Sequence, residues 1–119
     1  MEMDLRINVK DSGGLPVIEL GGELDAYTCS RLRDTMIEVI DGGKATVIVS
    51  MLKVEYIDSS GLGTLVGGLK RASEHSGKIG IVCTNPQIRK VFEITGLFRV
   101  FPLYDTEEEA IRDIQRSAA

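Results

Sequence analysis

The feature that most constrains the fold is a strand-like segment followed closely by the start of a helix. Residues Thr46–Met51 form a mainly β-branched, uncharged run without alternation, which is typical of a strand covered on both faces. Beyond this run, apolar residues recur at the three- and four-residue steps of an amphipathic helix, at Leu62, Leu65, Val66 and Leu69. Because Asp58, Ser59 and Ser60 precede that series, we expect them at the N-terminus of the helix.

The preceding residues predict a hairpin and a first helix. Leu5–Val9 and Leu15–Gly22 alternate between apolar and polar residues and are separated by the turn cluster Asp11–Gly14, as in a β-hairpin. Helical spacing then runs over residues 29–40 and ends at Asp41-Gly42-Gly43, a sequence suited to a left-handed helix cap. The hairpin therefore leads into the first of several strand–helix units.

The C-terminal half continues this alternation. A buried strand is predicted over residues 78–83, and Asn85-Pro86 opens a helix that ends at Gly96. A short strand over Arg99–Leu103 precedes a capping box, Thr106 to Glu109, that begins a last helix. The order predicts an α/β fold with one mixed, mostly parallel sheet of about five strands, an N-terminal hairpin and about four packed helices. We expect residues 1–119 to form this single domain.

The two serines at the predicted helix start are the candidate functional residues. Free backbone N–H groups and the positive end of the helix dipole favour negative charge there, so Ser59 or Ser60 is well placed to carry a phosphate. The alternative is ordinary capping, in which Asp58 or Ser59 stabilises the first turn by about 1 kcal/mol. The spacing alone leaves both interpretations open.

The surroundings of the serines exclude a hydrolase nucleophile. A nucleophile elbow needs Gly-x-Ser-x-Gly, but Ile57 and Asp58 stand where the first glycine would be for Ser59 and Ser60. The single histidine, His75, is predicted near the other end of the same helix, so no catalytic triad can form. The glycines after the serines lack a following Gly-Lys-Ser/Thr and favour a surface that another backbone can approach, with nucleotide binding as the weaker alternative.

Composition excludes further classes of function. The net charge of −4 lacks the basic excess of a protein that binds nucleic acid. The longest uncharged apolar run, Thr46–Leu52, is too short to span a bilayer, and no signal-peptide pattern precedes it, so we expect a cytoplasmic protein with no membrane partner. Cys29 and Cys83 lack a CxxC pairing, so we expect free thiols, no metal and no cofactor.

Three motifs together resemble the STAS domain family, and specifically its stand-alone bacterial members, the anti-sigma factor antagonists. The motifs are Gly22–Asp25 after the second strand, Tyr56–Gly63 at the second helix and Phe92–Leu97 at the end of the third helix. The resemblance covers nearly the whole chain, and the middle motif is highly specific in order and placement. One difference is Ser50, where many relatives carry Asp or Asn.

The resemblance implies that Ser59 is the phosphoacceptor of a partner switch. In this family, the unphosphorylated protein binds an anti-sigma factor that is also a serine kinase, and a sigma factor is released. The kinase then phosphorylates the antagonist, and a PP2C-type phosphatase resets it. We therefore expect a regulatory protein without catalytic activity of its own.

We expect the partner surface to surround Ser59, and Asp25 to face this surface from the loop after the second strand. The glycines have no side chains and so let a partner approach the surface closely. The residues assigned to this surface are Asp25, Asp58, Ser59, Ser60, Gly61 and Gly63. A monomer is expected, and a weak dimer stays open. The alternative function is a STAS-type scaffold or ligand-binding module in another signalling pathway. Such scaffolds usually carry an additional N-terminal domain, which we do not expect here.

Overall fold

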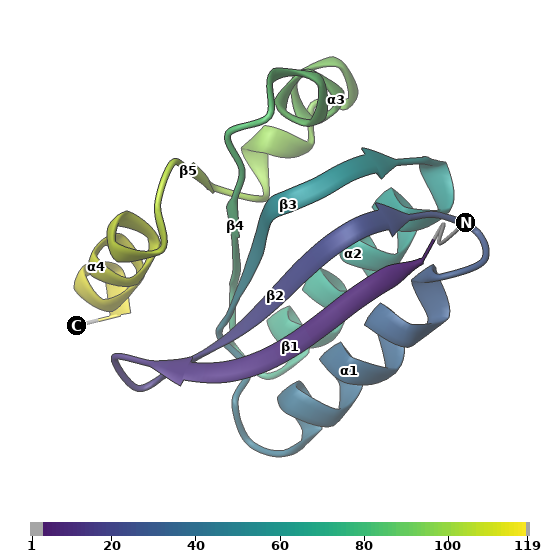
Figure 1. Cartoon of the computed structure of the whole chain (residues 1–119). Coiled ribbons are helices and arrows are strands. Elements are labelled where there is room, and N and C mark those ends of the chain that lie inside the picture. The colour runs from purple at the N-terminus through teal and green to yellow at the C-terminus, as the bar shows by residue number, and fades with distance from the viewer. Residues whose placement is uncertain (1–3, 119) are drawn as a thin grey trace.

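The computed structural model describes residues 4–118 of the protein. One mixed sheet of five strands organises them (Figure 1). The strands are β1 (Leu5–Ser12), β2 (Leu15–Leu24), β3 (Val47–Ile57), β4 (Ile79–Val82) and β5 (Leu103–Tyr104), and they lie side by side in chain order. The β1–β2 hairpin is antiparallel, whereas the three later pairings are parallel. The predicted fold class is confirmed.

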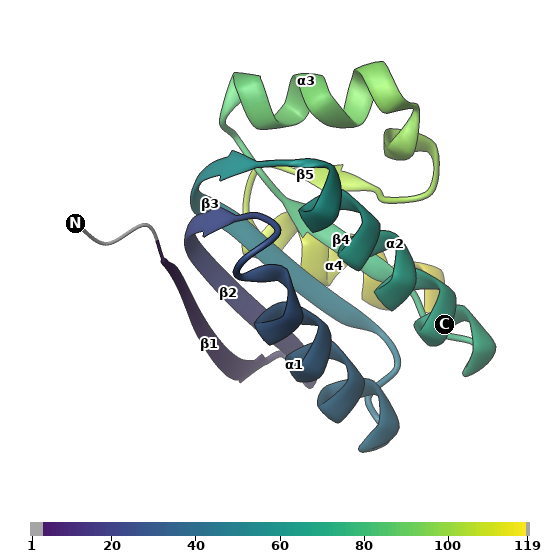
Figure 2. The same ribbon diagram turned by 90° about the vertical axis from the view of Figure 1, so that its right-hand side faces the viewer.

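The helices divide between the two faces of the sheet. They are α1 (Cys29–Asp41), α2 (Ser59–Glu74), α3 (Pro86–Thr95) and α4 (Glu107–Ala118), with a 3₁₀ turn, η1, at Leu97–Arg99. Right-handed crossovers that all advance in one direction across a sheet place their helices on one side. Accordingly, α1 and α2 lie together on one face, and α4 lies on the other (Figure 2).

Two groups of buried side chains hold these layers together. The larger group joins the sheet to α1, α2 and α3 through residues such as Leu32, Leu65 and Phe92. The smaller one joins Val17, Ile48 and Val82 to Ala110 and Ile114 of α4. Because β3 contributes to both groups, its run of five buried residues from Val47 to Met51 shows no alternation, as predicted.

Two predicted boundaries were wrong. The strand predicted at Thr46–Met51 continues to Ile57. The prediction ended too early because β3 holds two extra residues relative to β2, one after Ser50 and one after Val54. These bulges remove the alternation by which a strand is recognised. The strand predicted at Arg99–Leu103 is instead η1 followed by the two-residue β5, because the N–H groups of Val100 and Phe101 bond to the carbonyl of Leu97.

The turn around η1 places an aromatic residue in the core. Phe101 is buried and packs edge-on against Phe92, with ring centroids 6.0 Å apart. Both cysteines have free thiols, as predicted, with Cys83 buried and Cys29 half-buried. No helix within residues 4–118 combines the length and the apolar character needed to cross a lipid bilayer.

Candidate functional site

Ser59 is the first residue of α2 and follows directly on the end of β3. The cap of this helix is Asp58, whose Oδ1 accepts the N–H of Gly61 at 3.0 Å. Ser59 is exposed, and its hydroxyl makes no hydrogen bond within the part of the chain that the structure describes. Of the two capping alternatives, the structure therefore assigns the cap to Asp58 and leaves the Ser59 hydroxyl available for chemistry.

Ser60 has different surroundings from Ser59. It is half-buried and, with Gly63, Thr64 and Gly67, lines a groove between α1 and α2. The Ser60 carbonyl also accepts the hydroxyl of Thr64 at 3.0 Å. The two hydroxyls are therefore distinct, and Ser59 is the more accessible one.

Gly61 lets the start of α2 approach the end of β2. A Cβ added there would lie 2.7 Å from the carbonyl oxygen of Leu24 and 2.8 Å from its Cγ. Gly61 is buried and therefore acts in packing. It does not face outward, in contrast to the expectation that it lies on the partner surface. Gly63 is exposed with open space around its Cα, as a low partner surface requires.

Asp58 also ties α2 to the loop of residues 25–28 between β2 and α1. Its Oδ2 accepts the N–H of Ala26 at 3.2 Å, and its own N–H donates to the carbonyl of Leu24 at 3.2 Å. One carboxylate thus fixes the helix start and a loop more than thirty residues earlier in the chain. The start of α2 and this loop are therefore joined by direct hydrogen bonds.

Asp25 organises the same loop from within. Its Oδ1 accepts the N–H groups of Tyr27 at 2.9 Å and of Thr28 at 3.1 Å, and its own N–H donates to the Thr28 hydroxyl oxygen at 3.0 Å. The Thr28 hydroxyl is buried and also donates to the carbonyl of Glu23 at 2.8 Å. Asp25 is half-buried, and one of its carboxylate oxygens is thus committed to holding the loop.

Two exposed tyrosines, one in this loop and one near the end of β3, were missed as site residues by the sequence analysis. Tyr27 is 91% exposed and Tyr56 is 50% exposed. Together with Asp25, Asp58 and Glu23 they line a shallow groove at the end of the sheet next to Ser59. Tyrosine is enriched at the energetic centres of protein interfaces. A large aromatic residue two positions after the loop aspartate, between a predicted strand and a predicted helix, was the available signal.

The exposed tyrosines and the carboxylates beside Ser59 form a surface suited to binding. Asp25, Tyr27, Tyr56, Asp58 and Ser59 together are called the Ser59 surface below. His75 is exposed at the far end of α2, where it was predicted. Among residues 4–118, no cluster of His, Cys, Asp and Glu could hold a metal ion.

Comparison with known proteins identifies the fold and the motif together. The sequence pattern of the STAS domain matches residues 6–110. The chain belongs to the STAS domain family. The family predicted from the motifs is thus confirmed, and the Ser59 surface lies at the motif Tyr56–Gly63 that carried the resemblance.

Several relatives of this STAS domain are named anti-sigma factor antagonists. An anti-sigma F factor antagonist of Paenibacillus polymyxa is 32% identical over 114 residues, covering 95% of this chain and 97% of the relative. The structure of an anti-sigma factor antagonist from Mycobacterium paratuberculosis superposes with a TM-score of 0.88 at 26% identity and covers 97% of both chains.

A third comparison concerns a protein known in two states. The Bacillus cell fate determinant SpoIIAA in its phosphorylated form matches with a TM-score of 0.72 at 29% identity, covering 92% of this chain and 99% of SpoIIAA. Its unphosphorylated form matches with a TM-score of 0.73. The fold of this STAS domain is therefore shared with a relative that exists in both forms.

Proposed function

We propose that this STAS domain protein is an anti-sigma factor antagonist that is switched off by phosphorylation of Ser59. The observation that carries the proposal is that two different residues at the start of α2 provide the helix cap and the exposed hydroxyl. Asp58 caps the helix, so the exposed Ser59 hydroxyl can be modified without loss of the cap. The names of the relatives support the regulatory role.

In the proposed cycle, the unphosphorylated protein binds an anti-sigma factor that is also a serine kinase, and a sigma factor is released. The partner covers the Ser59 surface, where Tyr27 and Tyr56 offer contact area and Asp25 and Asp58 offer negative charge. Ser60 and Gly63 lie at its border with the groove between α1 and α2.

Phosphorylation acts through charge in this proposal. A phosphoserine adds about −1.5 to −2 charge at neutral pH, and the N-terminus of a helix accommodates it. In a complex, the partner displaces the water that screens the phosphate from the carboxylates of Asp25 and Asp58, so their repulsion becomes stronger than in the free protein. Two like charges ~4 Å apart interact by ~4 kcal/mol at an effective dielectric constant of ~20. Half of that repulsion weakens binding by more than about tenfold.

The remaining parts of the cycle follow from the same chemistry. A PP2C-type phosphatase removes the phosphate from the exposed Ser59 and restores binding. The protein acts by association, without catalysis of its own, in the cytoplasm where sigma factors act. A single STAS domain spanning residues 1–119 is enough for this role in the proposal.

Site-resolved mass spectrometry tests the phosphoacceptor. The wild-type protein, Ser59→Ala and Ser60→Ala are each incubated with ATP and the anti-sigma factor kinase of the source organism. We expect one phosphate on the wild type and on Ser60→Ala, and none on Ser59→Ala. Stoichiometric phosphate on Ser60 in the wild type would refute the assignment. Failure of every such kinase to bind the wild type would refute the proposed function.

A further inference from the structure

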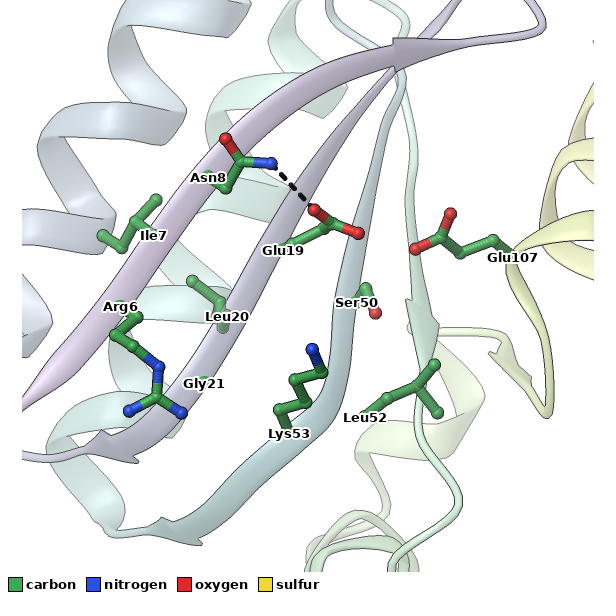
Figure 3. Close-up of a pocket in the computed structure, with 10 residues that line it drawn as sticks. All are labelled: Arg6, Ile7, Asn8, Glu19, Leu20, Gly21, Ser50, Leu52, Lys53 and Glu107. Atoms are coloured by element: carbon green, nitrogen blue, oxygen red, sulfur yellow. Dashed lines mark hydrogen bonds between the residues drawn. The ribbon is translucent and has the colours of Figure 1, made fainter.

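The face of the sheet opposite α1 and α2 carries a second groove, away from the Ser59 surface. On this face, α4 packs over Val17, Ile48 and Val82. The adjoining part of the face, over β1, β2 and β3, is hollowed into a groove of about 230 Å³ (Figure 3). We call it the sheet groove, and its main lining residues are Arg6, Asn8, Glu19, Ser50, Leu52 and Lys53.

Two departures from regular strand geometry shape the sheet groove. The first is the bulge in β3, since Ser50 pairs with Glu19 but Lys53, and not Leu52, pairs with Gly21. Bulges of this kind re-aim side chains beside binding sites. The second is Gly21 itself, where an added Cβ would lie 2.8 Å from a terminal nitrogen of Arg6. The missing side chain lets the guanidinium lie across the sheet.

At one end of the groove, two carboxylates share one ammonium group. Lys10 Nζ lies 3.0 Å from Oε2 of Glu19 and 2.9 Å from Oε1 of Glu107, the first residue of α4. Asn8 donates to the other oxygen of Glu19 at 2.8 Å. The hydrogen bonds from Asn8 and Lys10 lower the pKa of Glu19 below its usual value. Glu19 shares the Lys10 ammonium with Glu107, so this end of the groove keeps a net negative charge.

The other end of the groove holds two cations. Among residues 4–118, neither Arg6 nor Lys53 forms an ion pair, whereas Lys10, Arg31, Arg71 and Arg89 each have an acidic partner. Figure 3 shows the Arg6 guanidinium and the Lys53 ammonium on the same face of the sheet, on either side of Gly21. Ser50, only 4% exposed, lines the groove between the two ends.

We propose that the sheet groove binds a small organic anion. Its carboxylate or phosphate group is held between Arg6 and Lys53, and its short carbon chain lies along Ser50 and Leu52. The groove is smaller than the ~300–1,000 Å³ of sites for drug-sized ligands, so the ligand is a metabolite of a few carbon atoms. This binding is independent of the proposed partner switch, because the groove and α2 lie on opposite faces of the sheet (Figure 2).

Amide chemical shifts provide the test. The ¹⁵N-labelled full chain is titrated with glycerol 3-phosphate and, separately, with succinate, at constant ionic strength because exposed charges are screened by salt. Glycerol, which lacks the anionic group, is the control probe. We expect saturable shifts at Gly21, Ser50 and Lys53 with at least one anion. The anion that binds with the higher affinity identifies the class of ligand. Glycerol leaves these amides unchanged.

Variants decide whether the two cations hold the anion. Arg6→Gln and Lys53→Gln each raise the dissociation constant about tenfold or more, because hydrogen bonds between charged groups are the strong ones. Lys90→Gln, an exposed cation on α3, is the matched control and leaves it unchanged. If Arg6→Gln does not fold, Lys53→Gln carries the comparison alone.

Three results would overturn the proposal. The first is the absence of saturable shifts in the groove with both anions. The second is unchanged affinity in the cation variants. The third is a set of shifts confined to the start of α2, which would place the anion at the helix N-terminus. None of these results bears on the partner switch, because no anti-sigma factor is present in the titration.

Discussion

The substitution Gly61→Ala probes the contact that positions the start of α2. The new methyl carbon would lie 2.7 Å from the carbonyl oxygen of Leu24, 2.8 Å from its Cγ and 3.0 Å from Cγ1 of Ile57. The nearest neighbour is a backbone atom, which cannot turn aside as a flexible side chain can. The helix must therefore move away from β2, and such overpacking costs about 1–3 kcal/mol.

A second glycine in the same helix is a matched control. Gly63 has nothing within 4 Å of an added Cβ. Alanine is favoured over glycine within a helix by about 0.5–1 kcal/mol, so Gly63→Ala is expected to stabilise the protein by that amount. At Gly61 the same gain offsets part of the clash, and the net destabilisation is about 1–2 kcal/mol. The same chemical change thus has opposite signs two residues apart.

Urea denaturation measures the difference directly. With a slope of about 1–3 kcal/mol per molar urea, the two midpoints should separate by roughly 1 M, with Gly61→Ala below the wild type and Gly63→Ala above it. The slopes should agree, since both variants expose the same surface on unfolding. A Gly61→Ala midpoint equal to or above that of the wild type would refute the packing argument.

Three further predictions concern the Ser59 surface and the sheet groove. Asp25→Ala should cost about 0.5–1.5 kcal/mol, because it removes the oxygen that accepts the Tyr27 N–H, while the Thr28 hydroxyl and N–H keep the carbonyls of Glu23 and residue 25 as acceptors. Asp25→Asn keeps an accepting oxygen and should retain most of the stability in urea denaturation, and equal losses would contradict this role. Tyr27→Ala should change the free energy of unfolding by no more than about ±0.5 kcal/mol yet weaken binding of the anti-sigma factor about tenfold. Val9→Ala, at an exposed position on β1, is the control. Unchanged affinity of Tyr27→Ala in calorimetry would remove Tyr27 from the interface. The pKa of Glu19 is lowered in the fold, so the ionised carboxylate stabilises the protein above its unfolded pKa of 4.5, and this stabilisation is lost as the pH falls below that value. The wild type should therefore lose more stability than Glu19→Gln between pH 6 and pH 3. Identical losses would contradict the pairing.

Local sequence signals predicted the element types because each had a physical cause that acts over a few residues. The helix starts at Asp58, Asn85 and Thr106 are all confirmed, since a side-chain oxygen accepts a nearby N–H in each case. The end of β3 was not predictable, because its bulges depend on pairing with β2. Residues 99–103 were misassigned because their apolar pattern serves to bury Phe101 rather than to form a strand.

The candidate site divides in the same way. Ser59 and Asp58 were identified from a contiguous motif, whose capping geometry is local. The hydrogen bond from Ala26 to Asp58 and the packing of Gly61 on Leu24 are contacts between segments far apart in the chain, and no spacing rule reveals them. The sheet groove depends on three strands and on α4 together, so no local sequence pattern reveals it.

The central claim, a charge-based switch at Ser59, is tested most directly by calorimetric titration of the anti-sigma factor kinase. Unmodified protein, protein phosphorylated at Ser59, and the variants Ser59→Asp and Ser59→Ala are compared under the same conditions. We expect the unmodified protein and Ser59→Ala to bind alike, and the phosphorylated protein and Ser59→Asp to bind at least about tenfold more weakly, with all four unfolding at similar temperatures. Equal affinities of the phosphorylated and unmodified proteins would contradict the account.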